Sequence, residues 1–475
     1  MIKISGRNAT GSSVNLSLRP VDAEGKGNFE WTAFAPIPAS DDPIADDLIG
    51  VGRAVYLADR AVRRSTAVGN VLRRLEVTIP VREHERLSAV APQLERLAEF
   101  ATCDTWRLNF TSLSKDHKAG EVRAPRRGEP RAVDVISLFS GGLDSLCGAA
   151  RVAGEGKRAL FVTHSPPGRE STESLVGDVY AAFGRERPGS EAFAAYRLET
   201  REASGNGRRV VFPEHSRRSR PFFFLCLAAA TAVRAAAERV WMSENGALAL
   251  SLPIRADTHG PSMARQAHSF MLHGFTEVLA ALKPRGRPSP VFDNPFAKQT
   301  KGEACQELKA AGPLAGRAMS CEYTGRQRAL FLRWLKDHPE RVEEFGSGPQ
   351  CGLCIPCLVR RAALRQAAID DPAATYFADA PRLVRRVAKR GGAIVAPFGI
   401  EHPPPLLNLV ASNVVHLPRF CEAIRAMDAR EFGLRYLPEL RANRDLDSAT
   451  ALSPAESLEL MSRFADEVLG FMHGS

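Results

Sequence analysis

A glycine-containing turn is the first place where this sequence could do chemistry. Residues 139–145 read F-S-G-G-L-D-S, after the apolar run V-I-S-L and before a helical pattern that starts with L-C-G-A-A. A strand, a glycine turn and a helix start leave backbone N–H groups unpaired, and these groups bind anions together with the positive end of the helix dipole. Glycines let the backbone approach a phosphate closely. The turn therefore predicts a phosphate site, with a plain helix cap at Ser140 or Asp144 as the alternative.

The kind of phosphate site follows from what the turn contains. It lacks the lysine of G-x-x-x-x-G-K-[ST], so a γ-phosphate site of the Walker type is not expected. Asp144 beside the phosphates indicates Mg²⁺, which binds one or two carboxylates together with phosphate oxygens. His164 ends the apolar run at 159–164 and could contact the same nucleotide, or be a structural residue at a strand end.

Four of the nine cysteines are spaced for a metal ion. Cys351, Cys354 and Cys357 form C-x-x-C-x-x-C, and Cys321 lies thirty positions before the first of them. Zn²⁺ takes four such ligands in a tetrahedron, and one C-x-x-C turn supplies two of them. An Fe–S cluster uses the same ligands, but nothing else in the sequence points to electron transfer. We expect structural zinc, with incidental buried cysteines as the alternative.

Three further segments carry polar groups where strands would end or helices begin. Arg220 opens a helical stretch, and its guanidinium could hold a carboxylate or a phosphate through paired hydrogen bonds. The Glu244 carboxylate could accept the N–H pair of a guanine-like ring, although the Asn245-Gly pair alone is a turn signal. Lys301 lies in T-K-x-E, a helix-capping pattern that also places an amine where it could stabilise a leaving pyrophosphate.

Positioning these groups requires the segment 132–372 to fold around one sheet. Its short apolar runs alternate with helical stretches, which is typical of an α/β protein with a doubly wound parallel sheet. Ligands bind beyond the carboxyl ends of the strands in such sheets, where the candidate groups would lie. We expect this α/β domain to follow an N-terminal α+β module with a basic linker (1–131) and to precede a mostly helical C-terminal extension (373–475).

The N-terminal module shows no catalytic constellation. Alternating apolar residues predict strands around 14–18, 75–79 and 106–110, and helical spacing predicts a helix over 87–100. The segment 114–131 is polar, basic and rich in glycine and proline, as expected of a linker. We interpret the module as a packing or docking unit.

Composition limits the classes of function. The chain has 475 residues, 44% hydrophobic and 25% charged, with a net charge of +10. This size fits two or three globular domains. No uncharged apolar run approaches the roughly 18 residues of a membrane span. The opening residues lack the apolar core of a signal peptide, so we expect a cytoplasmic protein. The charge permits ATP or nucleic acid as a ligand, but no basic stripe with interleaved aromatic residues supports nucleic acid.

The motifs together carry a family resemblance. S-G-G-L-D-S resembles the PP-loop of the N-type ATP pyrophosphatases, which cleave ATP between the α- and β-phosphates. With C…C-G-x-C-x-x-C and L-V-R-R-A-A-L, the chain is similar over about 135–365 to the QueC family of 7-cyano-7-deazaguanine synthases. R-S-R-P-F-F-F-L-C-L-A is similar to that family's R-N-x-x-F-L-x-x-A helix, S-E-N-G to its substrate loop, and the segment around T-K-G-E to its T-K-x-E motif.

The resemblance implies a fold of the adenine nucleotide alpha hydrolase-like type and a ligase that uses ATP, Mg²⁺ and Zn²⁺. Such an enzyme would adenylate the carboxylate of 7-carboxy-7-deazaguanine, or a close analogue, and pass it to an amine. Asp144 and Lys301 would be catalytic. The substrate would be bound by Arg220, Glu244, Asn245 and Arg265. ATP would be bound by Phe139, Ser140, Gly141, Gly142, Leu143, Asp144, Ser145 and His164.

The chain also departs from the family. The motif Y-P-D-C-R-x-x-F matches G-P-S-M-A-R-Q-A-H-S-F only loosely, since Arg265 is kept and the acidic residue is not. Long extensions flank the similar region, and in this respect the chain resembles the QatC proteins of Qat anti-phage defence systems. That resemblance implies a protein partner from the same system, whose amine would replace ammonia. The alternatives are nitrile synthesis with ammonia, a non-catalytic nucleotide-binding adaptor, and a tRNA-thiolation enzyme, which would need a sulfur-carrying cysteine.

Overall fold

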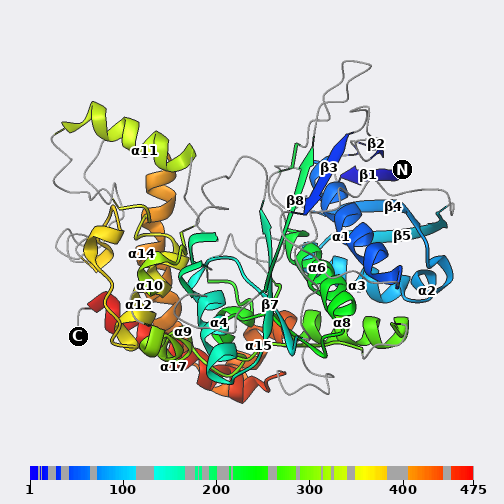
Figure 1. Cartoon of the computed structure of the whole chain (residues 1–475). Helices are drawn as coiled ribbons and strands as arrows, with labels where there is room; N and C mark the ends of the chain where they lie inside the picture. Colours follow the sequence, from blue (N-terminus) through cyan, green and yellow to red (C-terminus); the bar gives the residue numbers. More distant parts are fainter. Residues whose placement is uncertain are drawn as a thin grey trace.

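A computed structural model describes most of the chain (Figure 1). The described residues are 1–8, 11, 13–19, 28–33, 42–64, 72–113, 133–165, 177–179, 181–183, 192–200, 213–214, 218–254, 265–284, 289–311, 314–321, 326–339, 348–381, 405–441 and 451–473. The linker predicted at 114–131 lies outside them.

Six described strands form the central sheet, in the order β10-β9-β6-β7-β8-β3. The strands from β10 to β8 run parallel, and β3 pairs antiparallel with β8 at the edge. Their bounds are β3 Phe29–Ala33, β6 Val135–Leu138, β7 Ala159–Ser165, β8 Ala192–Thr200, β9 Arg239–Trp241 and β10 Val291–Asp293. The protein is therefore α/β, as predicted, with a mixed sheet whose edge strand comes from the N-terminal part.

Side chains of β6 alternate between two apolar cores. Ile136 and Leu138 belong to the core that contains α6, whereas Val135 belongs to the core that contains α4. Successive residues of a strand point to opposite faces, so a strand that is apolar throughout needs cover on both sides. The helices of this region are α4 Leu143–Gly154, α6 Arg220–Ala235, α7 Gly246–Ala249, α8 Ser269–Leu282, α9 Lys301–Cys305, η3 Gln306–Ala311 and α10 Leu314–Arg317.

A second sheet, in the order β2-β1-β4-β5, forms most of the N-terminal part. Its strands are β1 Ile2–Asn8, β2 Ser13–Leu18, β4 Arg73–Val81 and β5 Thr105–Ser112. Its helices are α1 Ile44–Ala61, α2 His84–Ala89 and α3 Ala91–Thr102. The three predicted strand segments are confirmed. The single predicted helix is divided at Val90, and Pro92 lies in the first turn of α3, where a missing N–H leaves no helical bond unmade.

Buried charged residues join this N-terminal part to the start of α6. Arg73 Nη2 lies 2.6 Å from Asp104 Oδ2 and also binds Asp59. Arg64 Nη2 contacts the same Asp104 oxygen at 2.6 Å. Asp59 accepts hydrogen bonds from the Ser219 amide and hydroxyl at 3.0 and 2.8 Å, at the N-cap of α6. Burial alone would raise the pKa of Asp59, but the two arginines lower it below its ordinary value.

The described N-terminal and central residues also share one apolar core. Residues of β1, β4 and β5 belong to the same cluster of buried side chains as residues of β6, β7 and α6. Buried residues on both sides of residue 131 thus belong to one core. The domain boundary at this residue stays a prediction.

The C-terminal extension is helical over most of its described residues, as predicted. In Figure 1, α11 and α14 lie on the opposite side of the central sheet from the N-terminal sheet. The helices of the extension are η5 Ala373–Thr375, α14 Pro405–Ala426, α15 Ala429–Arg435, α16 Leu437–Arg441 and α17 Pro454–His473. Two more helices, α11 Arg326–Asp337 and α12 Ile355–Gln366, precede residue 373. None of the helices in the described ranges combines the length and the apolar character needed to cross a bilayer.

Candidate functional site

The glycine turn joins the carboxyl end of β6 to the start of α4. Gly141 has φ +74°, a left-handed conformation that favours glycine, and Gly142 is the N-cap of α4. The Ser140 hydroxyl accepts a hydrogen bond from the Gly142 amide at 3.3 Å. The Ser145 hydroxyl donates to the Gly142 carbonyl at 2.8 Å. The flanking apolar residues of the turn are buried, namely Phe139 and Leu143.

Asp144 and Lys301 meet beside this turn. Asp144 lies in the first turn of α4, and Lys301 is the first residue of α9. Lys301 Nζ lies 2.5 Å from Asp144 Oδ2, and the two side chains are only 4% and 16% exposed. Asn245 Nδ2 donates to the other Asp144 oxygen at 3.1 Å. Burial by itself would lower the pKa of Lys301, but the carboxylates of Asp144 and Glu244 raise it above its ordinary value. Lys301 is therefore a cation.

The order of the strands explains why these groups meet. The turn follows β6, the Glu244–Asn245 pair follows β9, and Lys301 lies beyond β10. These strands are parallel neighbours, so their carboxyl ends lie at the same edge of the sheet. The structure thus brings together Asp144, Asn245, Glu244 and Lys301 from sequence segments that are far apart.

Glu244 lies half-buried next to Asp144. Its Oε1 accepts a hydrogen bond from Asn245 Nδ2 at 2.9 Å, and its carboxylate also accepts one from the Gln266 side chain. Burial and the neighbouring Asp144 charge raise the pKa of Glu244 to about 8. At neutral pH this carboxyl group is therefore largely protonated in the ligand-free protein.

Two residues of this site were not predicted from the sequence. Asn294 holds the backbone of Glu244, since its side chain donates to the Glu244 carbonyl at 2.8 Å and accepts from the Glu244 amide at 3.3 Å. Asn294 precedes a proline, and this turn signal directly after an apolar run could have identified it. Gln266 has no comparable signal, because its only distinction is that it follows Arg265.

His164 and Arg220 lie together against one aromatic ring. His164, near the carboxyl end of β7, is buried, with its ring centroid 5.6 Å from that of Phe224 and 4.9 Å from that of Phe223. The Arg220 guanidinium, at the first residue of α6, lies 4.7 Å from the Phe224 centroid. The roles of His164 toward ATP and of Arg220 toward the substrate stay predictions, because these aromatic contacts do not test them.

Arg265 contacts the N-terminal part instead of the Asp144 cluster. Its Nη1 donates to the Phe100 carbonyl at 2.7 Å, and its guanidinium lies 4.6 Å from the Phe100 ring centroid. Phe100 belongs to the last turn of α3, where a cation satisfies free carbonyls and the negative end of the helix dipole. The substrate-binding role that the resemblance implied for Arg265 has no support in these contacts.

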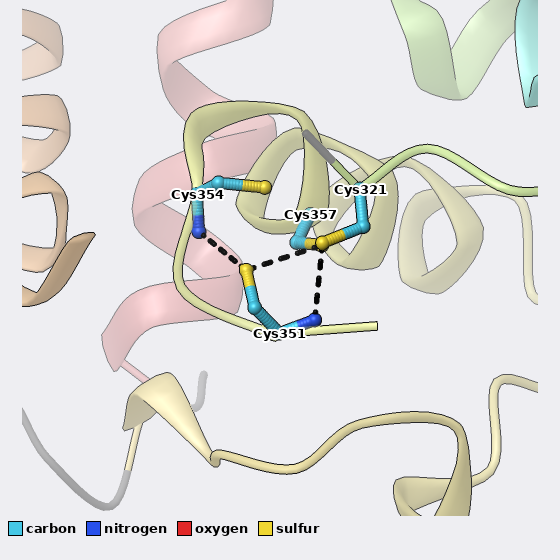
Figure 2. Close-up of side chains that lie close together, drawn as sticks. All are labelled: Cys321, Cys351, Cys354 and Cys357. Carbon is cyan, nitrogen blue, oxygen red and sulfur yellow. Dashed lines mark hydrogen bonds between the residues drawn. The ribbon is translucent and has the colours of Figure 1, made fainter. Parts of the chain in front are cut away.

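The four cysteines predicted to bind a metal form one cluster (Figure 2). Their Sγ atoms all lie within 4.8 Å of one another. The Cys351 amide donates to Cys321 Sγ at 3.3 Å, and the Cys354 amide donates to Cys351 Sγ at 3.1 Å. Amide N–H groups that point at sulfur favour the thiolate, which is the form that binds a metal. Cys321, Cys351, Cys354 and Cys357 could therefore hold a metal ion such as zinc.

A short segment before Cys321 connects this cluster to the glycine turn. The Met319 amide donates to the Gly141 carbonyl at 3.1 Å. The Ser320 amide donates to the Gln350 side chain at 3.0 Å, and Gln350 directly precedes Cys351 of the cysteine cluster. Residues that fix the cluster thus also fix the backbone at the left-handed glycine. We therefore expect a substitution in the cysteine cluster to change the backbone conformation at the glycine turn.

The fold and the site together define an α/β protein in which a buried lysine–carboxylate pair and a cysteine cluster flank a glycine turn. No protein-family model matches the chain, and a search of curated proteins finds no match either.

Proposed function

We propose that this protein is a PP-loop ATP pyrophosphatase of the QueC type, which adenylates the carboxylate of 7-carboxy-7-deazaguanine or a close analogue. The observation that carries the proposal is the 2.5 Å contact between Lys301 and Asp144 in the first turn after the S-G-G turn. A turn that lacks its own lysine has a buried ammonium group beside it. Backbone donors and a positive charge are what a leaving pyrophosphate needs.

The doubly wound PP-loop type of fold is part of this proposal. It is supported by the parallel run β10-β9-β6-β7-β8 and by the position of the turn at its carboxyl edge. Nucleotides bind at this edge in open α/β sheets.

The reaction proceeds in two steps. A carboxylate oxygen of the substrate attacks the α-phosphorus of ATP, the bond from this phosphorus to the oxygen bridging to the β-phosphate breaks, and pyrophosphate leaves with the electron pair. The acyl adenylate is a mixed anhydride. An amine attacks its carbonyl carbon, AMP leaves, the nitrogen loses a proton, and an amide remains. Holding the reactants in line and stabilising charge on the leaving group supply most of the rate enhancement.

Each role falls to a residue of the site. The amides at the start of α4 bind the phosphates, and Lys301 stabilises the negative charge that develops on pyrophosphate. Asp144 is the carboxylate that would hold Mg²⁺, which when bound neutralises phosphate charge. Glu244, once ionised, accepts the N–H pair of the deazaguanine ring. Cys321, Cys351, Cys354 and Cys357 would hold a structural metal ion, which would stabilise the segment that ends at Cys321.

The acceptor in this proposal is an amine of a partner protein from the same anti-phage defence system. The basis is that the chain extends well beyond the region that is similar to QueC, at both ends. Free ammonia as acceptor, with a second ATP, would give the nitrile instead.

The test combines ATP, 7-carboxy-7-deazaguanine and candidate partner proteins with the purified full chain. We expect AMP and pyrophosphate in equal amounts and a mass increase on one partner. Asp144→Ala should abolish the release of AMP and pyrophosphate as well as the mass increase on the partner. Asp134→Ala is the matched control, since this carboxylate is exposed and lies just before β6.

Three results would change the assignment. Pyrophosphate release that does not respond to the deazaguanine acid would overturn the substrate. A free nitrile without a partner adduct would identify a synthase that uses ammonia. ATP binding without any turnover, together with full biological activity of the Asp144→Ala protein, would identify a nucleotide-binding adaptor.

A further inference from the structure

The last helix of the chain reaches the residue pair at the candidate site. Glu467, in α17, is 8% exposed, and its carboxylate accepts a hydrogen bond from the Gly302 amide at 3.2 Å. It also accepts a short hydrogen bond from the Thr300 hydroxyl. Thr300 is the N-cap of α9, and Lys301 lies between these two contacts. A C-terminal carboxylate therefore binds the backbone on either side of Lys301.

The start of α9 is shaped to receive this carboxylate. A Cβ atom at Gly302 would lie 2.5 Å from Glu467 Oε1, so any larger residue would displace the carboxylate. Thr300 and Glu303 form a capping box, in which the Glu303 side chain accepts from the Thr300 amide and the Thr300 hydroxyl accepts from the Glu303 amide. Thr300 satisfies the amide of Glu303, and Glu467 satisfies the amide of Gly302.

A second side chain of α17, Arg463, also contacts the first turn of α9 and the residues before it. Arg463 Nε donates to Glu303 Oε1 at 2.8 Å, and Arg463 Nη2 donates to the Lys298 carbonyl at 2.9 Å. Arg463 and Glu467 are four residues apart, so they lie on one face of the helix. This face covers the segment from Lys298 to Glu303, which contains Lys301.

We propose that Glu467 is a positioning residue, which fixes the first turn of α9 so that Lys301 is held against Asp144. The role of Lys301 in the reaction rests on the proposed function, whereas the contact between α17 and α9 does not. The C-terminal extension is then a part of the site, and not only a surface for a partner.

The ionised carboxylate of Glu467 can hold the start of α9 in place and still lower the stability of the fold. Burial and the nearby Glu303 raise the pKa of Glu467 to about 7, against the opposing effects of Thr300, Gly302 and Arg463. A raised carboxyl pKa means that ionisation in the folded state reduces stability as the pH rises through about 7. A neutral amide at this position removes the buried charge but keeps only one acceptor oxygen, so we expect the melting temperature to change little above that pH even when Lys301 is held less firmly.

The experiment compares Glu467→Gln with Asp466→Asn in the full chain. Asp466 lies next to Glu467 on α17, but it is 61% exposed and contacts Arg425. Lysines are acetylated briefly with an N-hydroxysuccinimide ester above pH 7 and quantified by peptide mass spectrometry. Lys298, whose side chain is 62% exposed, is the internal reference for Lys301, whose side chain is 4% exposed. Pyrophosphate release and melting temperature are measured on the same samples.

We expect the labelling ratio of Lys301 to Lys298 to rise several-fold in Glu467→Gln and to stay unchanged in Asp466→Asn. Pyrophosphate release should fall about tenfold or more in Glu467→Gln, because misplaced catalytic groups lose rate steeply, while the melting temperature changes little. An unchanged labelling ratio in folded Glu467→Gln would overturn the proposal. If this variant does not fold, Glu467→Asp, which withdraws the carboxylate by one methylene, is expected to give the same increase in labelling.

The two proposals fail in different ways. If the unaltered chain releases no pyrophosphate, the proposed function is wrong, and the labelling ratio still decides the role of Glu467. If pyrophosphate is released equally by all variants and the labelling ratio does not change, the proposed function stands and Glu467 is only a packing residue.

Discussion

Lys301 Nζ lies 2.5 Å from Asp144 Oδ2, although 157 residues separate them in the sequence. Both side chains are largely buried, so each charge depends on the other for its stability. The pair joins the first turns of α4 and α9. Substitutions of Asp144 and Lys301 therefore test both the proposed reaction and the stability of the fold.

The first prediction concerns the energy of this pair. Asp144→Asn should lower the free energy of unfolding by about 3 kcal/mol, because the buried Lys301 ammonium loses the carboxylate that it contacts directly and keeps only Glu244 as a nearby acidic group. The double variant with Lys301→Met should be more stable than Asp144→Asn alone. Urea unfolding of the single and double variants gives the coupling energy.

Lys157→Met is the control for that cycle, since its contact with Glu155 is exposed. The side chains of Lys157 and Glu155 are 34% and 42% exposed. We expect a change of no more than about 0.5 kcal/mol. Strictly additive effects of Asp144→Asn and Lys301→Met would show that the two charges are not coupled.

The second prediction is a pH dependence of substrate binding. The pKa of Glu244 is raised to about 8, and only the ionised carboxylate accepts an N–H pair. The affinity for the deazaguanine acid should therefore increase from about pH 6 toward pH 8 and level off above it. Calorimetric titration measures this profile.

Glu244→Gln should bind weakly at every pH, because an amide cannot accept both N–H groups. Glu238→Gln, an exposed carboxylate position just before β9, should keep the full pH profile. A profile that is the same in Glu244→Gln and the unaltered chain would remove Glu244 from the binding site.

The third prediction concerns the cysteine cluster. Cys354→Ser should lose the bound metal, which we expect to be about one zinc ion per chain, and should lower the melting temperature. Pyrophosphate release should fall as well, because the segment from Met319 to Cys321 holds the Gly141 carbonyl. Elemental analysis and thermal unfolding give the first two readouts.

Cys103→Ser is the matched control, because Cys103 is half-buried and lies outside the cluster. It should keep the metal. Iron together with the visible absorption of a cluster would identify an Fe–S centre and contradict the assignment of zinc.

The fourth prediction concerns the joint between the N-terminal part and α6. Arg73→Met should lower the free energy of unfolding by about 3 to 5 kcal/mol, because Asp59 and Asp104 then share a buried site with one arginine fewer. Arg74→Met, at the exposed neighbouring position of β4, should change it by no more than about 0.5 kcal/mol. Urea unfolding of both variants measures these changes. Equal effects would contradict a stabilising role for the contacts of Arg73 with Asp59 and Asp104.

Local patterns in the sequence predict several strands of both sheets. The alternation in 75–79 and 106–110 predicts β4 and β5, and the apolar run before the glycine turn predicts β6. The spacing of Cys351, Cys354 and Cys357 likewise predicts a shared site, because one turn of chain brings such residues together. These predictions succeed since each depends on residues that are close in the sequence.

Contacts between distant elements could not be predicted in this way. Nothing near Phe29–Ala33 indicates that this strand leaves its own module and pairs with β8. Arg265 has a motif that implies substrate binding, yet it binds the carbonyl of Phe100. Asn294 and Gln266 join the site only because neighbouring strands and loops place them beside Glu244.

Local sequence patterns predict an α/β chain with a glycine turn between a strand and a helix, four cysteines spaced for one metal ion, and a helical C-terminal extension. Only the packing of distant elements brings Lys301 to Asp144 and Glu467 of α17 to the start of α9. Periodicity and spacing report short-range backbone preferences, so they cannot predict such contacts. The partner of a buried charge depends instead on how helices and strands more than 150 residues apart pack around one sheet.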